Sequence, residues 1–380
     1  MKKILSFIMA LALFMFTPIC VFAASEDELA SAAEEIGVDV EEIADGIPDS
    51  AEDLLDDNGI TPTNTEAMTS LKPSDVLSYL WQTVKDKAAY PLKVFAAVVA
   101  VIMLSALVEG LGDTIADKKL TKIYGIICVI VAVSVIASPV SETIRSAARA
   151  LNDGGVFMAG YIPIFSSITA SSGYFTSAAS YSLIVIFASD AAVMIASQFM
   201  IPVLSVCMAL GIVEAINPNF SLSGITSAVQ TGTKIVITFI MVVFLGLLST
   251  QSIIGASADT LGVKAAKFAA SNFIPVVGSA VADAYTTVKA SLGLLRGGVG
   301  FFGIAAIFLL AAPPLIEVGL MRLAFSAAEL LTDVFGVNSV KILLKNTVKI
   351  LSLVFSILVC FAVMLIISTA IVMLIGLNAY

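Results

Sequence analysis

The feature that most constrains this chain is a series of apolar runs, each long enough to cross a lipid bilayer. A helix of about 20 apolar residues spans the hydrocarbon core, and we expect about eight such spans here. They lie at 92–110, 123–140, 178–197, 199–216, 235–253, 298–312, 313–331 and 350–375. The boundaries near 197–199 and 312–314 are open, and a tight hairpin is one solution at each. Because lipid offers backbone groups no hydrogen bonds, the runs predict an all-α polytopic membrane protein.

Composition removes most enzyme classes. Hydrophobic residues make up 59% of the 380, charged residues only 13%, and there is no histidine. A soluble domain has about 25% charged residues, and triads and metal sites commonly need histidine. Cys128, Cys207 and Cys360 lie apart in apolar stretches with no CxxC spacing, which favours packing roles. We therefore expect no enzyme, no catalytic residues, no cofactor and no metal site; without a basic stripe we also expect no nucleic acid.

The N-terminal part carries most of the acidic charge. Residues 1–23 are typical of a signal peptide, with Lys2 and Lys3 before a short apolar run and small residues up to Ala23. An uncleaved first transmembrane helix is the alternative. In the following leader, residues 24–71, 15 of the 29 acidic residues occur and Lys and Arg are absent before Lys72. A signal peptide makes this leader extracytoplasmic, as a docking segment for a partner or as a solvated, partly disordered segment.

Residues 72–90 predict an amphipathic helix at the membrane interface. Trp81, Lys85, Lys87 and Tyr90 are side chains that suit the boundary between lipid and water. The first two transmembrane helices follow within 91–140.

The remainder resembles an internal duplication, with units at 150–250 and 262–376. At a constant offset of 111 residues, Pro202 matches Pro313 and Lys234 matches Lys345. Each unit holds three spans and a preceding Ile-Pro segment, at 155–174 with Pro163 and at 263–286 with Pro275. Three spans are an odd number, so the second copy is expected to be inverted in the membrane.

The Ile-Pro segments are the expected broken or re-entrant elements, because proline removes a helix donor. They line a pathway, or they are sites of close helix packing through small residues. In an inverted arrangement, cysteines placed at Ser227 and Asn338 label from opposite sides of the membrane.

Loop charges favour a particular orientation. With the N-terminus outside, the positive-inside rule assigns the basic residues of three regions to the cytoplasm. Both chain ends then fall outside. These regions hold Lys118, Lys119 and Lys122; Lys264, Lys267, Lys289 and Arg296; and Lys341, Lys345 and Lys349.

Three ionisable residues lie within the predicted spans: Asp190, Glu317 and Arg322. A charge at membrane depth costs a few kcal/mol on insertion scales, so it usually faces protein or water. Asp190 is a candidate partner for Arg322, since Glu317 and Arg322 are five residues apart. The three are candidates for a transport pathway; a structural pair between helices, or an Arg322 that reaches the interface, is the alternative.

Several short motifs together resemble the stage III sporulation protein AE family of endospore-forming bacteria. They are YFTSAAS at 174–180, INPN at 216–219, LLSTQS at 247–252, KAAKF at 264–268, NFIPVVG at 272–278 and SLGLL at 291–295. None is a catalytic signature.

The resemblance implies a multi-pass protein of the mother-cell membrane around the forespore. It implies a subunit of the channel or feeding-tube complex across two membranes, acting as a conduit or export-gate component. Partners would include a cytoplasmic ATPase, ring-forming proteins of the intermembrane space and a forespore-side protein. A self-sufficient secondary transporter and a structural anchor that recruits partners through the leader are the alternatives. The substrate, the oligomeric state, including a possible homo-oligomer, and the presence of a pore within one chain stay open.

Overall fold

All the long elements in the described part of the chain are helices. The computed structural model describes residues 26–37, 55, 61, 73–115, 118–217, 223–273 and 278–374, so the predicted signal peptide and most of the leader lie outside it. The elements are α2 (Glu26–Glu35), α5 (Pro73–Ile115), α6 (Lys118–Ser171), α7 (Phe175–Val193), the π-helical segment η2 (Met194–Met200), α8 (Ile201–Ile216), α9 (Ser223–Phe273), α10 (Gly278–Phe335) and α11 (Asn338–Met373). The all-α prediction is confirmed.

Six helices in the described ranges are long and apolar enough to cross a membrane. Their apolar parts are Ser74–Val108, Ile123–Ser171, Phe175–Ile216, Gly224–Ala265, Thr286–Phe335 and Val340–Met373. The chain is therefore a multi-pass membrane protein by helix length and composition, as expected from the apolar runs.

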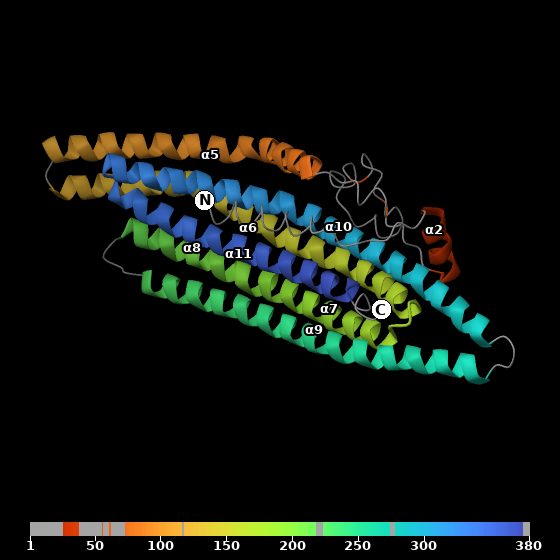
Figure 1. Cartoon of the computed structure of the whole chain (residues 1–380). Helices are drawn as coiled ribbons and strands as arrows, with labels where there is room; N and C mark the ends of the chain where they lie inside the picture. The colour runs from red at the N-terminus through yellow and green to blue at the C-terminus, as the bar shows by residue number, and fades with distance from the viewer. Residues whose placement is uncertain are drawn as a thin grey trace.

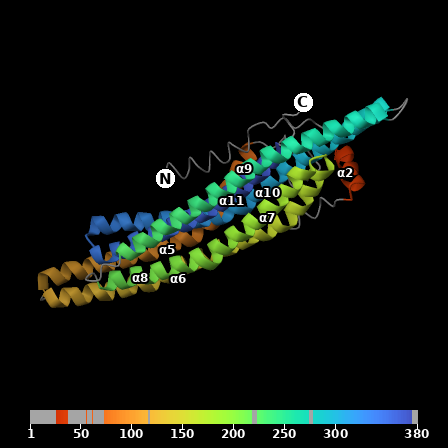
Figure 2. The same cartoon turned by 90° about the horizontal axis from the view of Figure 1, so that it is seen from below.

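The long helices lie side by side, and helices that follow one another in the chain run in opposite directions (Figure 1). We call end A the end at which α5, α8 and α10 finish and α6, α9 and α11 begin, and end B the end at which α6 and α9 finish and α7 and α10 begin. Helices α5 and α6 extend furthest at end A, and helices α9 and α10 extend furthest at end B (Figures 1 and 2). The bundle is thus a staggered set of antiparallel helices.

The expected count of eight spans is wrong, because the chain does not turn at either open boundary. At 197–199 the helix passes from α7 through η2 into α8, and Met194 and Ile201 both keep helical dihedral angles. The π-helical turn absorbs the local disturbance just before Pro202. At the other boundary Pro313 and Pro314 lie inside the continuous helix α10. Each pair of predicted spans is therefore one long helix.

Because these helices are unbroken, the direction expected for the second repeat unit also changes. Each unit now contributes two long helices, α7–α8 with α9 and α10 with α11, and two is an even number. The second copy consequently runs the same way as the first, so the inversion expected from three spans is wrong for these helices. Ser227 lies near the start of α9 and Asn338 begins α11, and both helices begin at end A. Lys264 and Lys289 lie towards end B, whereas Lys118 and Lys341 lie at end A. The prediction that all four lysines lie on the same side of the membrane is therefore wrong.

The first Ile-Pro segment is not re-entrant. Helix α6 continues through Pro163 to Ser171, and the hydroxyls of Ser166 and Ser167 donate to the Pro163 carbonyl oxygen at 3.0 and 2.9 Å. The second segment includes residues 274–277, so Pro275 lies outside the described residues.

An aromatic stack fills the inner side of this α6 segment. Phe157, Tyr161 and Phe165, spaced four apart, stack with ring centroids 5.7 and 5.3 Å apart, and Phe165 meets Tyr181 edge-on at 5.6 Å. All four rings are buried. A Cβ at Gly303 would overlap the Tyr161 ring, so glycine lets α10 approach α6 here. This side of the segment is close-packed core.

Helices α10 and α11 form the centre of the bundle. Two-thirds (67%) of the most apolar window of each is buried in the chain, against 11% for α9, which lies on the outside. Their tight turn follows from Gly336, whose φ of 75° allows the Val337 N–H to donate to the Thr332 carbonyl at 3.0 Å.

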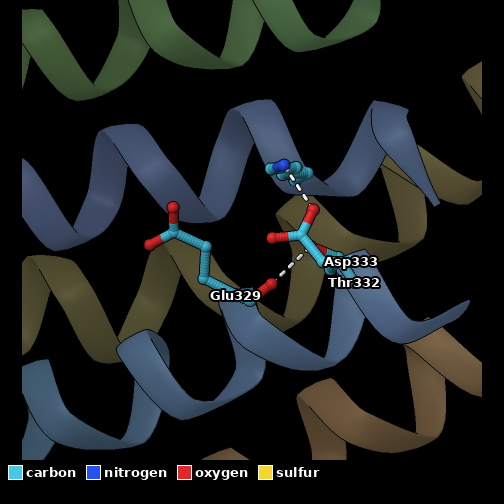
Figure 3. A network of polar contacts seen from close by, with 4 residues as sticks. Glu329, Thr332 and Asp333 are labelled. Atoms are coloured by element: carbon cyan, nitrogen blue, oxygen red, sulfur yellow. Dashed lines mark hydrogen bonds and ion pairs between the residues drawn. The ribbon is translucent and has the colours of Figure 1, made fainter. Parts of the chain in front are cut away.

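Polar contacts fix the same turn. The Thr332 hydroxyl donates to the Glu329 carbonyl oxygen at 2.6 Å, and Asp333 pairs with Lys341 at the start of α11 (Figure 3).

One piece of the acidic leader packs against the body. Helix α2 contacts α10, and its Ala32 and Ala33 are buried while Glu34 is exposed. This part of the leader is thus a docked helix that leaves Glu34 exposed.

Candidate functional site

The three ionisable residues expected within the spans do not form one cluster. Asp190 is exposed on α7, while Glu317 and Arg322 are half-buried on α10. Within the described ranges no ion pair under 4 Å joins Asp190 to Arg322. Glu317 instead lies 3.7 Å from the Nζ atom of Lys87 on α5. Of the other predicted residues, Pro202 is exposed and Pro313 half-buried.

The contact between Glu317 and Lys87 belongs to a charged belt midway along the bundle. Nearby, the Tyr90 hydroxyl donates to the Glu142 Oε2 atom at 3.2 Å, joining α5 to α6. We define the charged belt as Lys87 and Tyr90 on α5, Glu142, Arg145 and Arg149 on α6, and Glu317 on α10. Three helices therefore meet through polar side chains between two apolar stretches.

Helical spacing explains why the belt faces outward. On α6 the exposed Glu142, Arg145 and Arg149 are three and four residues apart, which places them on one face. Ile144 and Ala147, between them, are buried against the core. Helix α5 continues without a break through Pro91, so the predicted interfacial helix and the first span are one helix.

The α6 part of the belt borders an open groove of about 740 Å³. Its lining consists of Ser138, Ser141, Glu142, Arg145, Ala148 and Arg149. Two pockets between the helices are much smaller, about 20 Å³ between α6, α10 and α11 and about 30 Å³ between α7–α8, α9 and α11, with apolar linings. Such volumes are close to that of a single water-sized probe. The belt groove is therefore a polar concavity on the surface, unlike these interior pockets.

A second polar cluster holds the α6–α7 turn at end B. The two carboxylate oxygens of Asp259 on α9 accept the backbone N–H groups of Thr176 and Ser177 at 2.8 and 2.9 Å. Asp259 thus caps the N-terminus of α7, satisfying donors that the helix leaves unpaired. A Cβ at Gly255 would lie 2.9 Å from the Ser177 Oγ and 3.1 Å from its Cα, so glycine permits this approach.

Two cations complete that cluster. The Lys289 ammonium and the Arg296 guanidinium lie 4.6 and 4.7 Å from the ring centroid of Tyr174, and Arg296 is buried. Sequence reasoning treated both as loop charges and missed Asp259. An acidic residue at the end of an apolar run marks Asp259 as unusual, but it does not indicate the contact with α7.

Neither cluster has the composition of a metal centre. In the part of the chain that the structure describes, no three Cys, Asp or Glu side chains come together as a metal site requires.

Comparison with known proteins gives one consistent result. The sequence model of a family described as Stage III sporulation protein AE matches residues 62–376. Stage III sporulation protein AE of Bacillus subtilis (strain 168) is 22% identical over 307 residues, which cover 81% of this chain and 77% of that protein. No solved structure matches the chain.

Proposed function

Because the chain belongs to the stage III sporulation protein AE family, we propose that it is an integral membrane subunit of the channel complex between mother cell and forespore. It lies in the mother-cell membrane around the forespore, with its acidic leader outside the cytoplasm. Its partners are other stage III sporulation proteins of the membrane and of the intermembrane space. The observation that carries the proposal is the family match over nearly the whole membrane body, 62–376.

The packing of the helices favours a conduit built by assembly rather than through one chain. The interior pockets described above hold about 20 and 30 Å³ and have apolar linings. The aromatic stack occupies the space between α6 and α10. Among the described residues, these two pockets offer no path for polar solutes, so the path is formed with further copies of the chain or partner subunits, and this protein is part of its wall or gate.

A self-sufficient transporter fits the same contacts less well. Its coupling site would lie between helices at membrane depth. Asp190 is exposed on the outside of α7, and Glu317 pairs with Lys87 near the surface. These positions do not converge on a central site.

Complementation of a sporulation-defective strain tests the proposal. We expect Asp190→Asn and Arg322→Ala to reduce sporulation if they lie along an assembled path, while the purified chain alone transports nothing in vesicles. Normal sporulation with both substitutions, combined with loss of sporulation on deletion of 24–71, would favour the structural anchor. Solute uptake by the purified chain in vesicles would favour the transporter.

A further inference from the structure

The charged belt separates two apolar zones that are offset along the bundle. Towards end A lie the apolar residues 91–108 of α5, with Lys93 as their one charge, and 123–141 of α6. Towards end B lie 297–316 of α10 and 357–373 of α11, which contain no charged residue. The neighbours of two α10 glycines give the register of α10 against α11, since Gly319 faces Phe355 and Gly300 faces Met373.

Each zone is about as long as one bilayer core is thick. Helical segments of 17–20 residues rise about 26–30 Å, which is close to the thickness of the hydrocarbon layer. A flat bilayer therefore holds one zone and not both in full. Whichever zone it holds, the charged belt lies at its edge, at the level of the lipid headgroups.

The side chains near the charged belt are of the types found at the level of the lipid headgroups. Trp81 is 60% exposed on α5, and the Lys85 ammonium lies 5.6 Å from the centroid of its ring. Tyr90 is exposed further along the same helix. Aromatic residues with lysine and arginine are the usual anchors at the boundary of a bilayer.

Arg145 and Arg149 add a specific feature to this general character. They are four residues apart on the exposed face of α6, and among the described residues neither forms an ion pair within 4 Å. The groove beside them also carries the side chains of Ser138 and Ser141. Glu142, the acid of the groove, accepts the Tyr90 hydroxyl. Among the residues that line the groove, two guanidinium groups and one carboxylate leave a positive charge. Guanidinium matches phosphate with two parallel hydrogen bonds.

We propose that the groove beside Arg145 and Arg149 binds the phosphate headgroup of an anionic phospholipid and so sets the height of the bundle in the bilayer. The charge of the groove, its two hydroxyl side chains and its position at headgroup level all fit this ligand. The inference does not depend on the channel function, because a headgroup site serves a conduit, a transporter or an anchor equally.

Native mass spectrometry of the purified full chain tests the site. The protein is released from nanodiscs containing equal amounts of phosphatidylglycerol and phosphatidylcholine, and the retained lipids are counted. We expect Arg145→Gln with Arg149→Gln to lower retained phosphatidylglycerol about tenfold or more, since a hydrogen bond to a charged group contributes about 1.5–3 kcal/mol. The matched control is Lys345→Gln with Lys349→Gln, another exposed pair four residues apart, on α11. We expect the control to change retention less than about twofold, which is the limit for surface charge effects of a few tenths of a kcal/mol.

Three outcomes would overturn the site. Unchanged retention in the arginine variant contradicts it directly. An equal loss in the lysine control means diffuse attraction between charges. Release of the lipid by millimolar inorganic phosphate means an anion site without lipid preference. If the glutamine pair does not fold, Arg145→Lys with Arg149→Lys keeps the charge but loses the paired hydrogen bonds, and full retention by that variant would also contradict the proposed geometry.

Discussion

Removing the Asp259 carboxylate should loosen the start of α7 more than any change on the exposed side of that helix. Asp259 is 5% exposed, and its two oxygens accept the N–H groups of Thr176 and Ser177 at 2.8 and 2.9 Å. In Asp259→Ala both donors lose their acceptor in a partly buried turn. A hydrogen bond to a charged group contributes about 1.5–3 kcal/mol, so two give roughly 3–6 kcal/mol as an upper bound.

Water entering the vacated space offsets part of that loss. We therefore expect the free energy of local opening at this turn to fall by about 2–4 kcal/mol. Since 1.4 kcal/mol is a factor of ten, the amides of Thr176 and Ser177 should exchange about 30- to 700-fold faster. Asp259→Asn should fall between Ala and the parent chain, because its amide oxygen can accept one of the two bonds.

Hydrogen–deuterium exchange of the purified protein in detergent measures this effect at the two amides. Asp190→Asn is the control, because it changes an exposed carboxylate on the same helix. Unchanged exchange in Asp259→Ala would refute the capping argument. Equal acceleration in the Asp190 variant would show that the effect arises from net charge and not from the cap.

Three further predictions rest on other parts of the bundle. Cysteines placed at Ser227 and Asn338 should react with an impermeant reagent from the same side of the membrane; labelling from opposite sides would contradict the helix directions at end A. Gly211→Ala should destabilise the protein by about 1–3 kcal/mol, since the new methyl group would overlap the Asn346 amide, and the change should lower the temperature at which the detergent-solubilised protein aggregates. Adding Asn346→Ala should restore most of that temperature, and simple addition of the two losses would argue against the contact. Gly303→Ala should cost a similar amount, about 1–3 kcal/mol, because the aromatic stack of α6 cannot move aside freely; an unchanged aggregation temperature would show that it can.

The sequence predicted the class of the protein well because its main constraint is local. Apolar runs, absent histidine and 13% charge all follow from counting, and they are enough to predict an all-α membrane protein. Six short motifs also predicted the family, which the match over 62–376 confirms. The predicted signal peptide lies outside the described residues and stays a prediction.

The number of spans and their directions could not be predicted by counting apolar residues. A rule of about 20 residues per span divides a longer helix wherever a proline or polar residue offers a boundary. Pro313 and Pro314 looked like such a boundary, yet α10 continues through them with neighbours packed on both sides. The merged helices turned an odd number of spans per unit into an even one, and the expected inversion disappeared with it.

For the candidate sites too, the sequence indicated some residues but not the residues they contact. Sequence reasoning found Glu317 because a charge in an apolar run is unusual, but its partner, Lys87, is 230 residues away on another helix. It missed Asp259 because nothing local indicates that α9 lies against the first turn of α7.

The amino-acid sequence by itself therefore determined that the chain lies in a lipid bilayer and that its long elements are helices. The first depends on the transfer of local apolar surface into lipid, and the second on the pairing of backbone groups within each segment. What only the tertiary structure decided was the register of one helix against another. That register depends on contacts such as Gly303 against Tyr161 and Gly255 against Ser177, where the absence of a Cβ sets how closely two helices approach. It places the charged belt between two apolar zones, and with it the surface that we expect to meet the lipid headgroups.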